Sequence, residues 1–158
     1  MSHIEMMRLA ESVALQSVCK RAQVGAVVRF ADPVRHNGYC IKALTGYNRN
    51  TDPRTIISTE FSCCEGEDGR TLPTVVHAEA DALHGASGYT SGATLYVTRQ
   101  PCINCAKLIV GAGISAVYYR DADDKTDGIE HLLAHGVFVS SAWLVGESWA
   151  ERWQEVVR

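Results

Sequence analysis

The sequence predicts an α/β domain of three layers (α-β-α), in which a mixed five-stranded sheet lies between helices. Apolar β-rich runs alternate with helical patterns in the second half of the chain, which is typical of parallel βαβ crossovers. In the first half, two β-rich runs flank a turn-rich stretch, which indicates an antiparallel hairpin. The 158 residues, 46% of them hydrophobic, suffice for one domain over residues 1–158 with its own core.

The first half of the chain predicts a helix and the hairpin. A helix from Ser2 to about Cys19 is expected because apolar residues recur there at helical spacing. Residues 23–30 (QVGAVVRF) are β-rich and mostly apolar, as in a strand buried on both faces. Turn residues fill 31–38 (ADPVRHNG), and 39–47 (YCIKALTGY) predicts the partner strand.

The rest of the chain begins with a long irregular stretch over residues 48–73, a length that in a compact domain is usually functional. The pattern then predicts a helix from about His77 to Ser87, a strand at 93–99, a helix at 101–112, a strand at 114–120, a helix at 127–134 and a short strand at 136–140. Trp149 and Trp153 lie at helical spacing, on a face that packs against the domain or serves an oligomer interface.

Composition narrows the classes of partner. The net charge is −3 and the pI is about 6.0, whereas proteins that hold long nucleic acids are usually basic. No apolar run reaches the length of a membrane span, and the N-terminal residues lack a signal-peptide core. We therefore expect a cytoplasmic protein with no membrane partner, whose six cysteines are reduced thiols or metal ligands.

Two short motifs carry chemistry. His77 and Glu79 lie in an apolar helix start, where burying an imidazole and a carboxylate is costly unless something pairs with them. Cys102 and Cys105 follow Pro101 as C-x-x-C, a spacing that puts both sulfurs on one face of a helix start. Two thiolates and one imidazole give zinc three ligands and leave the open fourth position of a catalytic site. Alone, the C-x-x-C could be redox-active or half of a structural site, and the histidine a core residue.

The spacing of His77 and Glu79 adds a constraint. Residues two apart in a helix point about 200° apart, so the two side chains converge only if His77 precedes the first helical turn. H-x-E followed by P-C-x-x-C is the signature of zinc-dependent deaminases. In such a site zinc makes hydroxide available near neutral pH, and Glu79 is expected to shuttle protons without being a ligand.

The chain resembles the cytidine deaminase-like superfamily, and within it the deoxycytidylate (dCMP) deaminases, including those of phage. The resemblance is carried by CKRAQVGAVV (19–28), TGYN (45–48), HAEADAL (77–83) and the long run ATLYVTRQPCINCAKLIVGAGISAVYY (93–119). It implies a cytidine deaminase-like fold and zinc-dependent hydrolysis of dCMP to dUMP and ammonia, feeding thymidylate synthesis. It also implies a homo-oligomer.

The same resemblance implies contacts with a small nucleotide substrate. Asn48 would contact the sugar or base, and the backbone around Ala78 and Gln100 would read the pyrimidine edge. Tyr119, followed by Arg120, would wall the pocket. The residues expected to help hold a 5′-phosphate are Lys20 and Arg21.

The chain departs from the family pattern at four places. Asp81 replaces the Asn of HAE-x-N, Arg49 replaces the Gly after Gly-Tyr-Asn, and Gln100 stands where Ser or Phe often precedes Pro-Cys. Regulated members carry a basic residue after the HAE helix, where this chain has HGASGYTSG (84–92). We therefore expect weak or absent control by dCTP and dTTP.

Four cysteines lie outside the zinc motif. Some phage-type relatives hold a second, structural zinc with residues of the first helix and the long loop. Cys19, Cys63 and Cys64 lie where such ligands would come from, but we favour buried, reduced cysteines that pack as small apolar residues. Cys40 belongs to the same group of unassigned thiols.

Other readings of the zinc motif stay open. The substrate could be a modified cytidine nucleotide, or the chain could be a tRNA or nucleobase adenine/guanine deaminase, although its acidic charge disfavours the tRNA alternative. A non-catalytic zinc module that binds a partner is a third class, but such a module has no need of Glu79 as a proton carrier.

Overall fold

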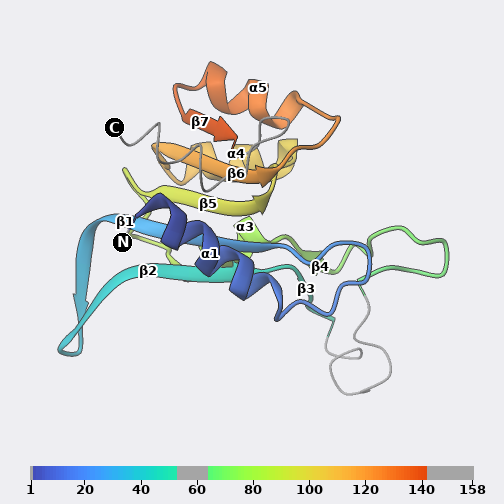
Figure 1. Ribbon diagram of the computed structural model, residues 1–158, viewed down its shortest axis with the longest axis horizontal. Coiled ribbons are helices and arrows are strands. Elements are labelled where there is room, and N and C mark those ends of the chain that lie inside the picture. The colour runs from blue at the N-terminus through green and yellow to red at the C-terminus, as the bar shows by residue number, and fades with distance from the viewer. Residues whose placement is uncertain (1, 53–63, 142–158) are drawn as a thin grey trace.

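The computed structural model describes residues 2–52 and 64–141 (Figure 1). The predicted face with Trp149 and Trp153 lies outside these residues, and so does Cys63. Among the described residues, no helix combines the length and the apolar character needed to cross a bilayer.

A mixed five-stranded sheet forms the middle of the molecule, with strand order β2-β1-β5-β6-β7. Strand β1 (Gly25–His36) pairs antiparallel with both β2 (Tyr39–Tyr47) and β5 (Thr94–Arg99). Strand β5 is parallel to β6 (Ala116–Asp121), which is parallel to β7 (Phe138–Ser141). The predicted mixed sheet, with its hairpin and its parallel crossovers, is confirmed.

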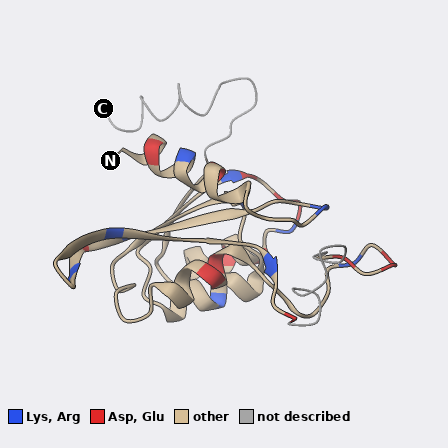
Figure 2. Ribbon diagram, turned by 90° about the horizontal axis from the view of Figure 1, so that it is seen from below, with Lys and Arg blue, Asp and Glu red and all other residues tan. Residues whose placement is uncertain are grey.

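Helices cover both faces of this sheet, and alternation along the strands sends neighbouring side chains to opposite faces (Figures 1 and 2). Val27 and Tyr96 pack with Met6, Met7 and Ala10 of α1 (His3–Ala14). On the other face, Ala26, Val28, Leu95, Val97 and Val117 pack with α3 (Ala78–Gly85), α4 (Ile103–Gly111) and α5 (Asp127–Ala134). The three-layer arrangement is therefore confirmed.

The first helix is shorter than predicted. Ser2 caps it in a capping box with Glu5, but it ends at Ala14 and does not reach Cys19. The chain leaves the helix because polar groups beyond it bond elsewhere: the Ser17 hydroxyl donates to the carbonyl of Asn48, and Gln23 Nε2 donates to the carbonyl of Ser17. The segment beyond the helix therefore lies against Asn48, the residue that follows β2.

The hairpin strand β1 is longer than predicted. Residues 31–36, expected as a turn, continue the strand after an irregularity between Arg29 and Val34, and the turn lies at Asn37 and Gly38, both with positive φ. Part of the long irregular stretch forms a second, small sheet. There β3 (Arg49–Asn50) pairs antiparallel with β4 (Val75–Val76), next to the start of α3.

Candidate active site

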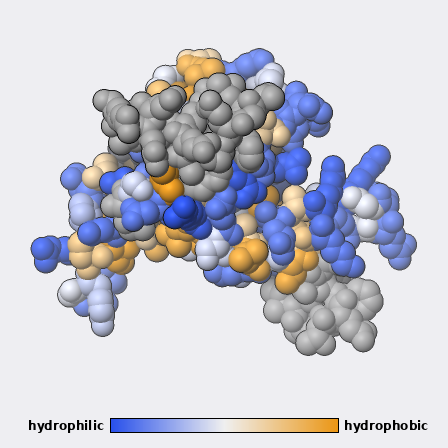
Figure 3. Space-filling model, viewed as in Figure 1, coloured by the Kyte–Doolittle hydropathy of each residue, from blue (hydrophilic) through white to orange (hydrophobic). Residues whose placement is uncertain are grey.

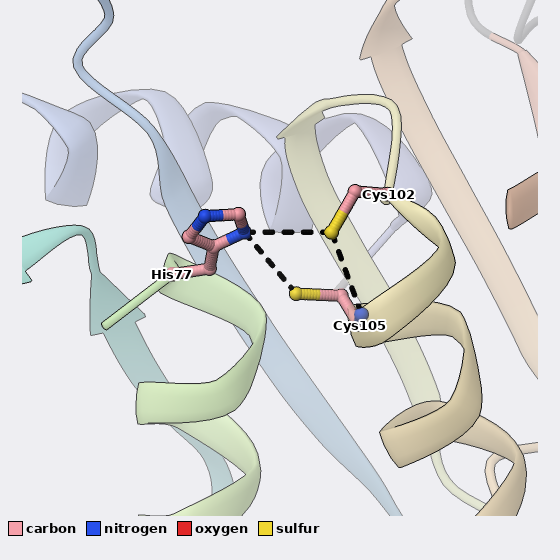
Figure 4. Close-up of side chains that lie close together, drawn as sticks. All are labelled: His77, Cys102 and Cys105. Atoms are coloured by element: carbon pink, nitrogen blue, oxygen red, sulfur yellow. Dashed lines mark hydrogen bonds between the residues drawn. The ribbon is translucent and has the colours of Figure 1, made fainter. Parts of the chain in front are cut away.

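Three candidate ligands meet where α3 and α4 begin (Figure 4). His77 is the N-cap of α3 and has extended backbone dihedrals, φ −72° and ψ 154°. Cys102 is the N-cap of α4, and Cys105 lies in the first turn of the same helix. The expectation that His77 precedes the helical turns is confirmed, and this non-helical position frees its ring to turn toward the two sulfurs.

The distances among these atoms suit zinc. His77 Nδ1 lies 3.6 Å from Cys102 Sγ and 3.4 Å from Cys105 Sγ. Tetrahedral zinc with bonds of about 2.0–2.3 Å to nitrogen and sulfur separates such ligand atoms by about 3.6 Å. The three donors therefore fit a zinc site, and one tetrahedral position is left for a molecule other than the protein.

The electrostatics favour one thiolate at this site. Contacts with Cys105 and then His77 lower the pKa of the Cys102 thiol to about 3, so this sulfur carries a negative charge. The contact with that thiolate, together with burial, raises the pKa of the Cys105 thiol. The positive ends of the α3 and α4 dipoles also lie at the site. A cation bound here would meet one thiolate at once and displace the proton of the second thiol.

Glu79 lies in the first turn of α3 and is only 4% exposed. Burial raises the pKa of its carboxyl to about 7, because water is no longer there to stabilise the charge. Among the described residues, no Lys or Arg forms an ion pair with it. A carboxyl group in this state can both accept and donate a proton near neutral pH.

Gly128 fixes the segment that carries the first sulfur. A Cβ atom at this first turn of α5 would overlap the carbonyl oxygen of Pro101 and would lie 2.9 Å from the carbonyl carbon of Cys102. Only glycine lets α5 pack this closely on the Pro101–Cys102 peptide. The helix therefore supports the start of α4 from behind.

A cavity of about 240 Å³ is lined by the candidate ligands His77 and Cys102 and by Glu79. Its other walls come from the segment around residues 21–24, from Asn48, from residues 64–75 and from the end of β5. Besides Glu79, four charged side chains line it: Arg21, Glu65, Arg99 and Asp123. Arg99 Nη2 is 2.8 Å from Asp123 Oδ2, whereas among the described residues Arg21 forms no ion pair.

Several residues predicted to bind substrate line this cavity, namely Arg21, Asn48, Ala78 and Gln100. Asn48 Oδ1 accepts from the Val24 amide, and Asn48 Nδ2 donates to the carbonyl of Ala22. One N–H and one lone pair of the Asn48 amide are left for a ligand. The Gln100 side chain instead donates to the carbonyl of Lys125 and accepts from the Asp123 amide, which holds the 123–125 loop against the cavity.

Other predicted residues do not line the cavity. Tyr119 packs against the core, and Arg120 forms ion pairs with Glu11 and Asp121. Lys20 is exposed next to Arg21, and its backbone amide donates to Glu65. A resemblance in sequence predicts which segment lies near the substrate. It does not predict toward which side each side chain of that segment points.

Residues 64–75 form a wall of the cavity that no sequence motif predicted. Glu65 accepts hydrogen bonds from the amides of Lys20 and Arg21, and it lines the cavity together with Thr71 and Cys64. Cys64 forms a disulfide with Cys19, 45 residues away. The expectation of reduced thiols is therefore wrong for this pair, because the loop brings two buried sulfurs together in a way that chain spacing cannot reveal. Cys40 is a free, exposed cysteine.

The comparisons with known proteins agree with the geometry. Residues 1–121 match the family model for the cytidine and deoxycytidylate deaminase zinc-binding region. The deoxycytidylate deaminase of Mycobacterium phage D29 is 38% identical over 112 residues, which are 70% of this chain and 88% of that protein. The yeast deoxycytidylate deaminase (Saccharomyces cerevisiae) is 37% identical over 123 residues, 73% of this chain but only 36% of the yeast protein.

A solved structure is similar over most of the chain. The dCMP deaminase of cyanophage S-TIM5, crystallised with dCMP and dUMP, has a TM-score of 0.69 and 37% sequence identity. The match covers 87% of this chain and 94% of the cyanophage chain. Residues 1–121, which the family model matches, contain the three candidate ligands, Glu79 and every residue of the cavity lining except Asp123.

Proposed function

Because this chain belongs to the cytidine and deoxycytidylate deaminase family, we propose that it hydrolyses dCMP to dUMP and ammonia in the cavity described above. The observation that carries the proposal is that Glu79 lines the same cavity as His77 and Cys102, two of the three clustered zinc-competent donors. The family membership and the phage and cyanophage relatives support the same reaction.

His77, Cys102 and Cys105 would hold the zinc ion. Zinc bound there supplies Lewis acidity, which lowers the pKa of a water molecule toward neutrality and makes it a nucleophile. The residues of the chain supply the rest of the chemistry. Cys105 and Glu79 are buried, so the reacting ring is shielded from bulk water on this side.

Glu79 is proposed to move the protons. Its carboxylate takes a proton from the attacking water and delivers it to N3 of the pyrimidine as a C–O bond forms at C4. It then takes the remaining proton from the new C4 hydroxyl and passes it to the amino group, so that the C4–N bond breaks, ammonia leaves and the C4 carbonyl of the product forms. The raised pKa of Glu79 suits this role, since the group must be a base and an acid in turn at one pH.

Different residues of the cavity are proposed to bind the base and sugar of the nucleotide and its 5′-phosphate. Asn48 and the backbone at Ala78 and Gln100 are proposed to face the base and sugar. Arg21 is proposed to hold the 5′-phosphate, because it lines the cavity while its guanidinium forms no ion pair among the described residues. Lys20 stays a second candidate from the sequence. Arg99 is a weaker candidate because Asp123 already neutralises it.

Measurement of ammonia release from a panel of substrates tests the reaction. The panel contains dCMP, CMP, deoxycytidine, dCTP, 5-substituted dCMP, adenosine, guanine and a tRNA anticodon stem-loop. dCMP is expected to have the highest kcat/KM. A better rate on a modified nucleotide, a purine or tRNA would replace the proposed substrate, and no release from any of them would end the proposal.

The phosphate contact has its own test. Arg21→Ala is expected to raise KM for dCMP about tenfold, the value of one charge-assisted contact, and to leave the weak turnover of deoxycytidine unchanged. Arg35→Ala, an exposed arginine of β1, is the matched control. Equal losses on dCMP and deoxycytidine would show that Arg21 does not bind the phosphate.

We also propose that the chain forms homo-oligomers and binds no long nucleic acid. Large apolar side chains are exposed on α4, α5 and β7, namely Leu108, Leu133 and Phe138, and these could be covered in an assembly. Figure 3 shows hydrophobic residues in small groups between hydrophilic ones on one face of the molecule. Acidic and basic residues are interspersed in Figure 2, which disfavours binding of a long nucleic acid. Light scattering after size-exclusion chromatography tests the assembly, and a monomeric mass would contradict it.

A further inference from the structure

Two of the departures from the family pattern meet in space. Asp81 lies in α3, and Arg49 begins β3, two residues after the end of β2. Arg49 Nη2 lies 2.8 Å from Asp81 Oδ1 and Arg49 Nε lies 3.2 Å from the same oxygen. The second oxygen, Asp81 Oδ2, accepts the amide of Tyr47 at 3.3 Å. One carboxylate thus binds the chain on both sides of Asn48.

We infer that Asp81 and Arg49 are positioning residues that hold Asn48 in the cavity wall at a fixed distance from Glu79. The inference rests on the proposed function for its effect on substrate, but the contact itself does not. Asp81 is two residues after Glu79 and four after His77 on the same helix. A link from Asp81 to residues 47–49 therefore joins the substrate-facing amide directly to the helix that carries the catalytic groups.

The other supports of Asn48 come from a different direction. Its side chain bonds to Ala22 and Val24, and its carbonyl accepts the hydroxyl of Ser17. These contacts fix Asn48 relative to the loop that follows α1, and none of them fixes it relative to α3. The Asp81 carboxylate supplies the contact with α3, so the Asn48 side-chain amide is held both from the loop after α1 and from α3.

Close packing brings the two elements within reach of each other. A Cβ at Gly46 would overlap the amide of Ala82 and would lie 2.7 Å from the carbonyl oxygen of Ala78. The end of β2 therefore lies directly on the first turns of α3. At this joint the Arg49 side chain is 43% exposed and that of Asp81 is 16% exposed, so water screens the pair only in part. Charge-assisted hydrogen bonds in such surroundings are stronger than those of an exposed pair.

Arg49 and Asp81 complement each other in charge. A glycine after Asn48 has no side chain to reach α3, and arginine opposite an asparagine would lack a counter-charge. Here the extra cation and the extra anion neutralise each other at the joint. Neither residue lines the cavity, so both act through Asn48 and not on the substrate itself.

A set of variants tests the inference with the zinc-loaded protein. Arg49→Ala and Asp81→Asn are each expected to raise KM for dCMP about tenfold, as for loss of a charge-assisted contact, while kcat and zinc content change less than about twofold. The double variant is expected to have a KM for dCMP no higher than that of the more impaired single variant, because both substitutions remove the same link. Glu11→Gln is the matched control, since it breaks the Glu11–Arg120 pair between α1 and β6, away from the cavity.

A second measurement needs no substrate. Deuterium uptake at residues 45–50 is expected to rise in Arg49→Ala and Asp81→Asn and to stay unchanged in Glu11→Gln. Unchanged uptake and unchanged KM, or losses that multiply in the double variant, would overturn the inference. An unmodified protein that fails to deaminate dCMP would instead remove the proposed function, and the exchange result would still decide whether the link exists. If Asp81→Asn does not fold, Arg49→Ala decides alone, because its side chain is the more exposed of the two.

Discussion

His77 and Cys102 occupy the same position in their two helices. Each is an N-cap with extended backbone, with φ and ψ of −72° and 154° for His77 and −73° and 169° for Cys102, and His77 Nδ1 lies 3.6 Å from Cys102 Sγ. Two helix starts therefore converge on one point, each with its positive dipole end directed there. Such a point favours thiolates, a carboxylate and the developing negative charge of a hydrolysis.

Replacement of Glu79 separates metal binding from turnover. Glu79→Gln is expected to keep zinc bound, because the side chain is not among the three ligands, and to lower kcat at least about 10²-fold through loss of proton transfer. Zinc content by atomic absorption and the rate on dCMP are measured together. Glu67→Gln, in an exposed turn, is the control. Substantial turnover in Glu79→Gln would show that another group carries the proton.

Loss of one sulfur should abolish zinc binding. Cys102→Ser leaves two ligands, and we expect loss of both zinc and activity at ordinary zinc concentrations. Cys40→Ser removes an exposed free cysteine and should alter neither. Chelation of zinc from the unmodified protein is expected to remove activity, and added zinc to restore it. Full activity of a zinc-free preparation would refute a metal-dependent reaction.

Gly128→Ala tests the support behind Cys102. Helix propensity alone favours Ala over Gly by about 1 kcal/mol. The added Cβ would lie 3.1 Å from the carbonyl oxygen of Cys102 and would overlap that of Pro101, and overpacking of this kind costs about 1–3 kcal/mol. We expect a lower Tm and weaker zinc retention. Gly111→Ala, with open space around its Cβ position, should not lower Tm. A rise in Tm for Gly128→Ala would contradict the close contact.

The zinc content of the purified protein follows from the cysteine pairing. With Cys19 and Cys64 joined in a disulfide, we expect one zinc per chain. Alkylation without reductant, read by mass spectrometry, is expected to leave both cysteines unmodified, and reduction should expose them. Two zinc ions per chain would show that these sulfurs are ligands of a structural metal.

Nucleoside triphosphates are expected to have little effect on the rate. Residues 84–92, at the end of α3 and just beyond it, contain no Lys or Arg that could bind a triphosphate. dCMP turnover measured with dCTP and with dTTP should change less than about twofold, far below a typical allosteric coupling. A several-fold response to either nucleotide would contradict this expectation.

Local patterns in the sequence determined the order of strands and helices and most of the zinc motif. The position of His77 before the first turn of α3 followed from its two-residue spacing to Glu79, since the geometry of a helix leaves no other way for both to converge. The C-x-x-C spacing likewise placed two sulfurs on one helix start. Such features depend on residues within a few positions of each other, and the periods of helix and strand are enough to predict them.

Only the tertiary structure decided which distant residues meet. The pairing of Arg49 with Asp81, the bonds of Asn48 to residues 22–24, and the disulfide of Cys19 with Cys64 all join segments more than twenty positions apart. The end of α1 at Ala14 has the same origin, because the Ser17 hydroxyl just beyond it bonds to the distant carbonyl of Asn48. These contacts depend on how closely elements pack, as at Gly46 and Gly128, and no local pattern encodes that distance.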